Sequence, residues 1–151
     1  MKPQELSAVQ TLALQALVNS GRLRAVPPDL KKAERFLFQS GESLSEIGKI
    51  DGAKLKHAIA YDSAHDVAES LVAAYGYATT NGTGQHQTLG EVLTIIFTES
   101  VNESAAEMFE QLRNDRNNIR YRSNEIGQAQ ANAAVQCAIT LLTAAKKILA
   151  T

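Results

Sequence analysis

Apolar residues recur every three or four positions along almost the whole chain, which is the period of an α-helix. Glycines, prolines and polar runs interrupt this pattern and divide it into successive segments. The predicted helices lie at about 4–19, from Pro27 to about Ile47, from Asp51 to about Tyr75, from Thr88, from Ser104, and at about 125–149. The predicted fold class is therefore all-α, an antiparallel up-and-down helical bundle of four to six helices.

Two of these helices begin with the pattern of a capping box, in which Ser or Thr is followed three residues later by Glu. The two boxes are Thr88–Glu91 and Ser104–Glu107. The segment from Gly76 to Gln87 has no helical period and contains a run of Thr, Asn and Gly, so we interpret it as a loop. No segment has the alternation typical of a strand, and no strand is predicted.

Each helix should bury one apolar side in the bundle. In the first helix these apolar residues are Leu6, Val9, Leu12, Ala16 and Leu17. In the last helix they are Ile126, Ala134, Cys137, Leu141, Ala145 and Ile148. We interpret Cys137 as a small core residue for this reason. We expect residues 1–151 to form one domain, in which 1–26 are an N-terminal helical extension and 27–149 are the core bundle.

Composition narrows the class of protein. With 151 residues, 44% of them hydrophobic and 21% charged, the chain is long enough for one domain and too apolar for intrinsic disorder. A formal net charge of −1 argues against a generally basic nucleic-acid or membrane-surface protein. A single cysteine cannot form an internal disulfide, and no apolar run suits a signal peptide or a membrane span. We therefore expect a cytoplasmic protein without a membrane partner.

Arginine is concentrated in one segment of the chain. Of the seven arginines, four lie between residues 113 and 122. On a helix, Arg113, Arg116, Asn117 and Arg120 fall in one sector. Arg116 and Arg120 form a like-charge pair four residues apart, which costs roughly 0.2–0.5 kcal/mol in the absence of an anion. Because one guanidinium group can donate two parallel hydrogen bonds to a phosphate, this sector is a candidate phosphate site.

A solvated helix face is the competing interpretation of the same segment. Four acids precede the arginines, namely Glu99, Glu103, Glu107 and Glu110. An acidic start and a basic end complement the helix dipole without any ligand. Charge and periodicity alone favour this interpretation over a phosphate site.

The chain contains three histidines, His57, His65 and His86. Asp62, His65 and Glu69 have a spacing that could present metal ligands from one helix, but no second cluster faces them. Surface ion pairing is the favoured interpretation, and no metal or other cofactor is expected. His86 could contact a nucleotide or supply a proton, or it could cap the next helix.

The segment from Leu112 to Tyr121 resembles the signature of the HEPN superfamily (higher eukaryotes and prokaryotes nucleotide-binding). That signature is an Arg, usually followed by a polar residue, with a His four to six residues beyond it. Residues 30–37 resemble the family's first long helix, while 61–71 and the following segment 84–87 resemble its second helix and turn. The resemblance covers about residues 27–149.

The resemblance implies a helical bundle that forms a homodimer and brings two Arg motifs to a shared cleft. It also implies metal-independent endoribonuclease chemistry of toxin–antitoxin, defence or RNA-processing systems. Arg116 matches the motif Arg, Asn117 the polar residue and Tyr121 the position of the His. Tyr121 is a departure from the motif, because a phenol with a pKa near 10 is a poor general base at neutral pH.

The expected function is binding of RNA or nucleotide phosphate, with Arg116, Asn117 and Tyr121 as candidate catalytic residues. The candidate residues for phosphate or RNA binding are Arg113, Arg120, Arg122 and His86. The departure at Tyr121 leaves enzymatic activity open. The alternative is a non-catalytic helical interaction subunit whose partner is a nucleotidyltransferase-type protein or other antitoxin.

Overall fold

The structure, a computed structural model, describes residues 1–80, 84–122 and 125–149, and only the backbone of residues 121 and 122. Its helices are α1 (Ala8–Asn19), α2 (Leu30–Ser45), the short 3-10 helix η1 (Ile47–Lys49), α3 (Ala53–Ala74), α4 (Gln85–Phe97), α5 (Glu103–Arg122) and α6 (Gln128–Leu149). Two short strands, β1 (Leu23–Ala25) and β2 (Tyr77–Thr79), complete the described elements. The predicted all-α class is confirmed.

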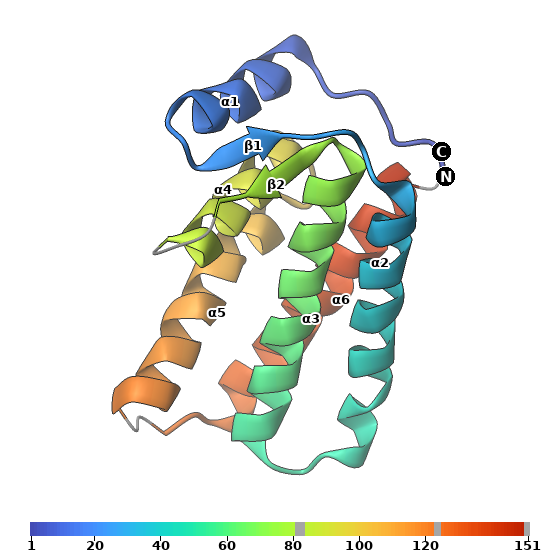
Figure 1. Cartoon of the computed structure of the whole chain (residues 1–151). Coiled ribbons are helices and arrows are strands. Elements are labelled where there is room, and N and C mark those ends of the chain that lie inside the picture. The colour runs from blue at the N-terminus through green and yellow to red at the C-terminus, as the bar shows by residue number, and fades with distance from the viewer. Residues whose placement is uncertain (81–83, 123–124, 150–151) are drawn as a thin grey trace.

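The four long helices α2, α3, α5 and α6 run alternately in opposite directions along the bundle (Figure 1). Helix α3 lies at the centre and contacts α2, α4, α5 and α6. The shorter α4 packs against α3 and α5, while α1 and the strands cover the end of the bundle where both termini lie (Figure 1). No helix in the described ranges is both long and apolar enough to cross a bilayer.

Small side chains form much of the core between α3 and α6. The fully buried alanines of these two helices include Ala60, Ala64, Ala68, Ala134, Ala138 and Ala145. Cys137 is buried in the same core, as predicted, and burial raises the pKa of its thiol to about 12. This cysteine is therefore an uncharged core residue rather than a reactive thiolate.

The predicted inward face of the first helix is wrong in part. Leu17 is buried as predicted, whereas Val9 and Leu12 are 73% and 70% exposed, and the buried Leu14 was not predicted. Helix α1 begins only at Ala8, after a capping box formed by Ser7 and Gln10. Because α1 lies across the bundle end and packs mainly against β1 and α4, just one narrow side of it meets the core.

The absence of strands was also predicted wrongly. Strands β1 and β2 pair antiparallel, with Arg24 opposite Ala78. Three residues are too few to show a period of two, so the sequence pattern does not reveal them. The approach to β2 requires glycine at position 76, where φ is +83° and an added Cβ would lie 2.8 Å from the carbonyl oxygen of Val26.

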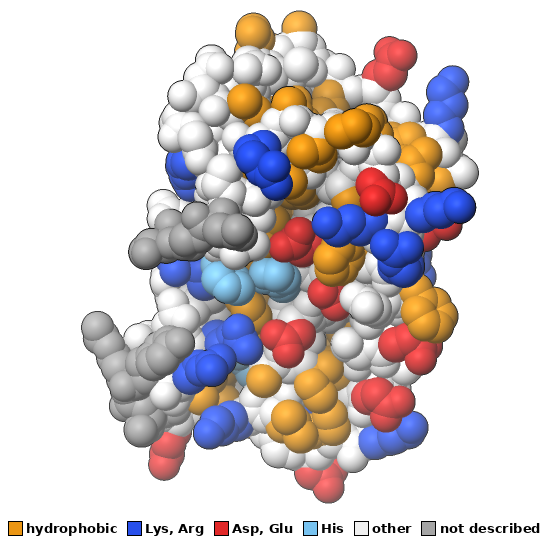
Figure 2. Space-filling model, viewed as in Figure 1, with side chains coloured by type: hydrophobic (Ala, Val, Ile, Leu, Met, Phe, Trp, Pro, Cys, Tyr) orange, Lys and Arg blue, Asp and Glu red, His pale blue; other side chains and the backbone are white. Residues whose placement is uncertain are grey.

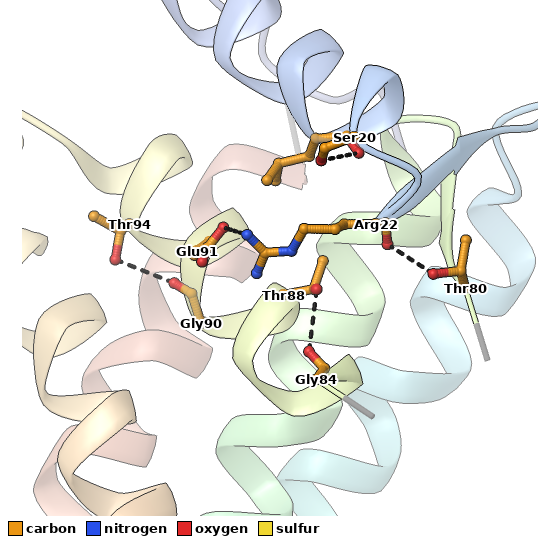
Figure 3. A network of polar contacts seen from close by, with 9 residues as sticks. Ser20, Arg22, Thr80, Gly84, Thr88, Gly90, Glu91 and Thr94 are labelled. Atoms are coloured by element: carbon orange, nitrogen blue, oxygen red, sulfur yellow. Dashed lines mark hydrogen bonds and ion pairs between the residues drawn. The ribbon is translucent and has the colours of Figure 1, made fainter. Parts of the chain in front are cut away.

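The capping box predicted at Thr88–Glu91 is wrong, because α4 begins one turn earlier at Gln85. The Thr88 hydroxyl donates to the carbonyl oxygen of Gly84, which precedes the helix and has a left-handed backbone (Figure 3). Glu91 pairs instead with Arg22 across a distance of 2.7 Å, which joins α4 to the start of β1 (Figure 3). The second predicted box is also wrong, because α5 begins at Glu103 and Ser104 therefore lies inside the helix rather than at its N-cap.

Candidate functional site

Helix α5 holds two of the predicted arginines against α3. The Arg116 guanidinium carbon lies 4.9 Å from the centre of the Tyr61 ring, and Nη2 is 3.6 Å from a carboxylate oxygen of Asp62. Arg113 donates two hydrogen bonds to Glu110, with 3.0 Å between Nε and Oε2. Arg113 is thus already bound by a carboxylate, whereas Arg116 has one looser ion pair and an aromatic contact.

A cleft of about 690 Å³ opens between the first turns of α3, the last turns of α5 and the residues before α6. We call it the basic cleft, and its lining residues are Lys54, His57, Ala58, Arg116, Ile119, Arg120, Glu125 and Ile126. In the described part of the chain, three cationic side chains and one carboxylate therefore line it. The volume falls within the range of small-ligand sites, and the excess of positive charge favours an anion.

His57 lies at the inner wall of the basic cleft and is fully buried. Neither ring nitrogen has a hydrogen-bond partner among the described residues, and Nε2 is 3.8 Å from a carboxylate oxygen of Asp115. Burial lowers the pKa of His57, Asp115 acts in the opposite direction, and Arg116 lowers it further. Buried polar atoms without a hydrogen-bond partner are uncommon in proteins. The His57 imidazole therefore distinguishes this cleft from an ordinary packed core.

Tyr61, His65 and His86 form a second group of side chains, which we call the histidine–tyrosine cluster. The Tyr61 hydroxyl is 3.1 Å from Nδ1 of His86, and the His65 and His86 rings lie 4.9 Å apart. Tyr61 is buried and stacks on Phe109 at 5.5 Å, so its hydroxyl has a fixed position. Figure 2 shows histidine side chains at the surface, with Lys and Arg side chains below them.

The cluster is uncharged at neutral pH. Burial lowers the pKa of His65 to about 4, with smaller contributions from His86 and Arg116. Burial also lowers the pKa of His86, assisted by Arg116 and Arg113 and opposed by Asp62. Burial raises the pKa of Tyr61 to about 12. The site therefore combines a cationic side chain, Arg116, with two neutral imidazoles and a protonated phenol.

The structure corrects two expectations for His86, its place in a loop and its role as a helix cap. His86 belongs to the first turn of α4 rather than to a loop, and its ring contacts Tyr61 instead of capping the helix. Of the surface ion pairs expected for Asp62, His65 and Glu69, the described residues show the one between Asp62 and Arg116. No group of three metal-ligating side chains comes together in the part of the chain that the structure describes.

The remaining candidates lie near the end of α5. Asn117 is exposed, and Arg120 lines the basic cleft. The side chains of Tyr121 and Arg122 are outside the described residues. Because α5 continues without a break through position 122, positions 116 and 121 are about 140° apart around the helix axis. The backbone therefore places the motif Arg and the residue at the His position in different sectors of one helix.

Sequence reasoning overlooked the aromatic part of the site. His57, Tyr61 and His65 are four residues apart in succession, and they define one stripe on α3. Phe109, Arg113 and Arg116 define a matching stripe on α5, and the two helices contact each other. The spacing was visible in the sequence, but which helix lies opposite α3 was not.

Comparison of the chain with protein families, with curated proteins and with solved structures found no match.

Proposed function

We propose that the protein binds RNA through its phosphate backbone in the basic cleft and cleaves it without a metal ion. The observation that carries this proposal is the position of Arg116, which lines the basic cleft and also lies over Tyr61 in the histidine–tyrosine cluster. A phosphate bound by Arg116 is therefore close to both cationic and proton-accepting side chains.

The charges of the cleft support binding of a phosphate backbone. Lys54 comes from α3, whereas Arg116 and Arg120 are one turn apart on α5. Two like charges at this spacing repel each other, and a bound phosphate would turn that repulsion into two attractive contacts. The net charge of −1 restricts this binding to a local site rather than to the whole surface.

Cleavage without a metal requires a cation to stabilise charge at phosphorus and a group that accepts the 2′-hydroxyl proton. Arg116 supplies the cation. The neutral imidazoles of His65 and His86 lie close enough for its charge to lower their pKa values. This chemistry agrees with the HEPN resemblance, in which the motif Arg has the same role. The same resemblance leads us to propose a homodimer as the working form.

Binding is tested with a fluorescein-labelled single-stranded RNA of random sequence, measured by fluorescence anisotropy over a series of salt concentrations. Arg116→Ala should weaken binding by about tenfold to a hundredfold, because hydrogen bonds to charged groups contribute roughly 1.5–3 kcal/mol. It should also make binding less dependent on salt, since one phosphate contact is lost. Arg35→Ala, which removes an exposed arginine of α2, is the matched control and should bind as the wild type does.

RNA affinity that is absent, or that survives Arg116→Ala unchanged, would show that the phosphate site is wrong. Co-purification of a stoichiometric nucleotidyltransferase-type partner, together with no RNA affinity, would favour the non-catalytic interaction subunit instead. Light scattering of the purified protein tests the homodimer separately.

A further inference from the structure

We infer that His86 and His65 transfer the protons in the RNA cleavage proposed above, and that Tyr61 positions His86 for this role. The inference rests on the proposed function and adds the groups that carry out its acid–base chemistry. The motif places a proton-transferring His on α5, where this chain has Tyr121. We assign the proton transfers to histidines of α3 and α4 instead.

The position of His86 suits a group that meets substrate. It is exposed in the first turn of α4, whereas the phenol that contacts its Nδ1 is buried. Stacking on Phe109 holds the Tyr61 ring, so the hydroxyl fixes the orientation of the imidazole. With Nδ1 engaged by Tyr61, Nε2 is the ring nitrogen left for the substrate.

His65 provides a second imidazole beside the first. Its ring centre is 4.9 Å from that of His86, and it lies one turn of α3 beyond Tyr61. Two imidazoles from different helices thus stand next to each other, close to the arginine that would hold the phosphate. This arrangement offers one proton acceptor and one proton donor to a single phosphodiester.

The charged groups around His86 come from both neighbouring helices. Arg113 and Arg116 of α5 lower its pKa in addition to burial, and Asp62 of α3 acts in the opposite direction. An incoming phosphate offsets the field of the arginines, which raises the pKa of both imidazoles. RNA binding therefore favours uptake of a proton by His86, the less strongly shifted of the two imidazoles, which then donates it.

The step balances without an external reagent. Neutral His65 accepts the proton of the 2′-hydroxyl while the 2′-oxygen forms a bond to phosphorus. The bond from phosphorus to the 5′-oxygen breaks, and protonated His86 gives its proton to that oxygen. Solvent then returns a proton to His86 and removes one from His65. The products are a 2′,3′-cyclic phosphate and a free 5′-hydroxyl.

Cleavage of the same labelled RNA, in buffer containing EDTA, tests the inference. His86→Ala and His65→Gln should each reduce the cleavage rate by about 10²–10⁴-fold, the usual contribution of a general acid or base. Both should still bind the uncleavable 2′-O-methyl form of the RNA, with a loss of affinity far smaller than the loss of cleavage rate. Gln87→Ala, which changes the exposed neighbour of His86, is the matched control and should cleave at the wild-type rate.

Tyr61→Phe separates positioning from fold. It removes the hydroxyl but keeps the ring that stacks on Phe109, so the melting curve should stay close to that of the wild type. Cleavage should fall by roughly fivefold to tenfold, as expected for the loss of one hydrogen bond. Protonated His86 donates from Nδ1 to the Tyr61 hydroxyl oxygen, so loss of this acceptor should lower the pKa of His86 and move the descending limb of the pH profile towards lower pH, which a purely structural role would not do.

The outcomes distinguish this inference from the function on which it rests. Wild-type cleavage that persists in His86→Ala overturns the proton-transfer inference and leaves the phosphate site standing. RNA that is bound through Arg116 but never cleaved also overturns it, with binding intact. RNA that is neither bound nor cleaved overturns both proposals.

Discussion

Arg22 and Arg116 have nearly the same side-chain exposure, 35% and 31%, but their surroundings differ. Arg22 is 2.7 Å from the carboxylate of Glu91, and this pair joins the covered end of the bundle to α4 (Figure 3). Arg116 is 3.6 Å from Asp62, and Lys54 and Arg120 line the same cleft. One arginine completes a pair within the fold, while the other belongs to a group with an excess of positive charge.

Other polar groups in these two regions of the molecule repeat the contrast. At the covered end, Gln10 donates to the carbonyl oxygen of Ile96 at 2.9 Å, and Tyr75 donates to that of Gln4 at 2.8 Å. Beside Arg116, the buried His57 has no hydrogen-bond partner among the described residues. Polar groups that satisfy one another stabilise a fold, whereas groups that remain unsatisfied mark the place where a ligand is expected.

Exchanging the two arginines for alanine gives the largest expected difference. Arg116→Ala should slow RNA cleavage by about 10²–10³-fold, the usual cost of removing one donor that stabilises transition-state charge. Arg22→Ala should leave cleavage unchanged and lower the free energy of unfolding by roughly 0.2–1 kcal/mol. Cleavage rates and thermal melts of both variants measure this contrast. Equal loss of cleavage in the two variants would mean that Arg116 acts through the fold.

The bundle itself followed from the sequence because its long helices bury continuous apolar sides. Ala134, Cys137, Leu141 and Ala145 of α6 were all placed correctly in the core. The prediction failed where contacts between distant elements decide the outcome. The burial of Leu14 in place of Val9 depends on how α1 crosses the end of the bundle, and no local period encodes that crossing.

The candidate site was predictable only in part for the same reason. The cluster of arginines is local in sequence, so Arg116 and Arg120 could be identified directly. The contact between Tyr61 and His86 joins residues that are 25 positions apart, and it exists only because α3 packs against α4. The spacing of residues shows which side chains share one face of a helix. To predict a site formed by three helices, one must also know how those helices pack together.

The pH dependence of stability gives the next largest effect. In the folded protein the pKa of His65 is about 4, below its ordinary 6.5, so the unfolded chain binds more protons between these values. Stability should therefore fall as the pH drops through this range, by on the order of 1 kcal/mol per pH unit from this group. Denaturant unfolding of His65→Gln should show a smaller decrease over the same range than the wild type shows.

Asp66 provides the control for this measurement because its pKa is shifted in the opposite direction. Burial, with Asp62 and Glu69, raises the pKa of Asp66 to about 6, so the folded protein gains stability as the pH falls below that value. Asp66→Asn should therefore make the acid-induced loss of stability steeper. Identical pH dependence in the wild type, His65→Gln and Asp66→Asn would contradict both assignments.

The smallest expected effect concerns the acid that competes with RNA for Arg116. Asp62 is largely exposed and 3.6 Å from the guanidinium, so Asp62→Asn should release Arg116 at little cost to the fold. Because exposed ion pairs contribute about 0.2–1 kcal/mol, RNA affinity should increase by at most about fivefold. Glu34→Gln makes the same change in net charge on an exposed side of α2 and should leave affinity nearly unchanged.

A difference between these two variants would show that Asp62 acts on Arg116 itself, since both change the overall charge equally. The salt dependence of binding should be the same for both, because neither alters the number of phosphates contacted. Weaker binding by Asp62→Asn would instead mean that the carboxylate holds Arg116 in its binding position. In that case Asp62 would have the same structural role towards Arg116 that Glu91 has towards Arg22, and the contrast between the two arginines would be one of degree.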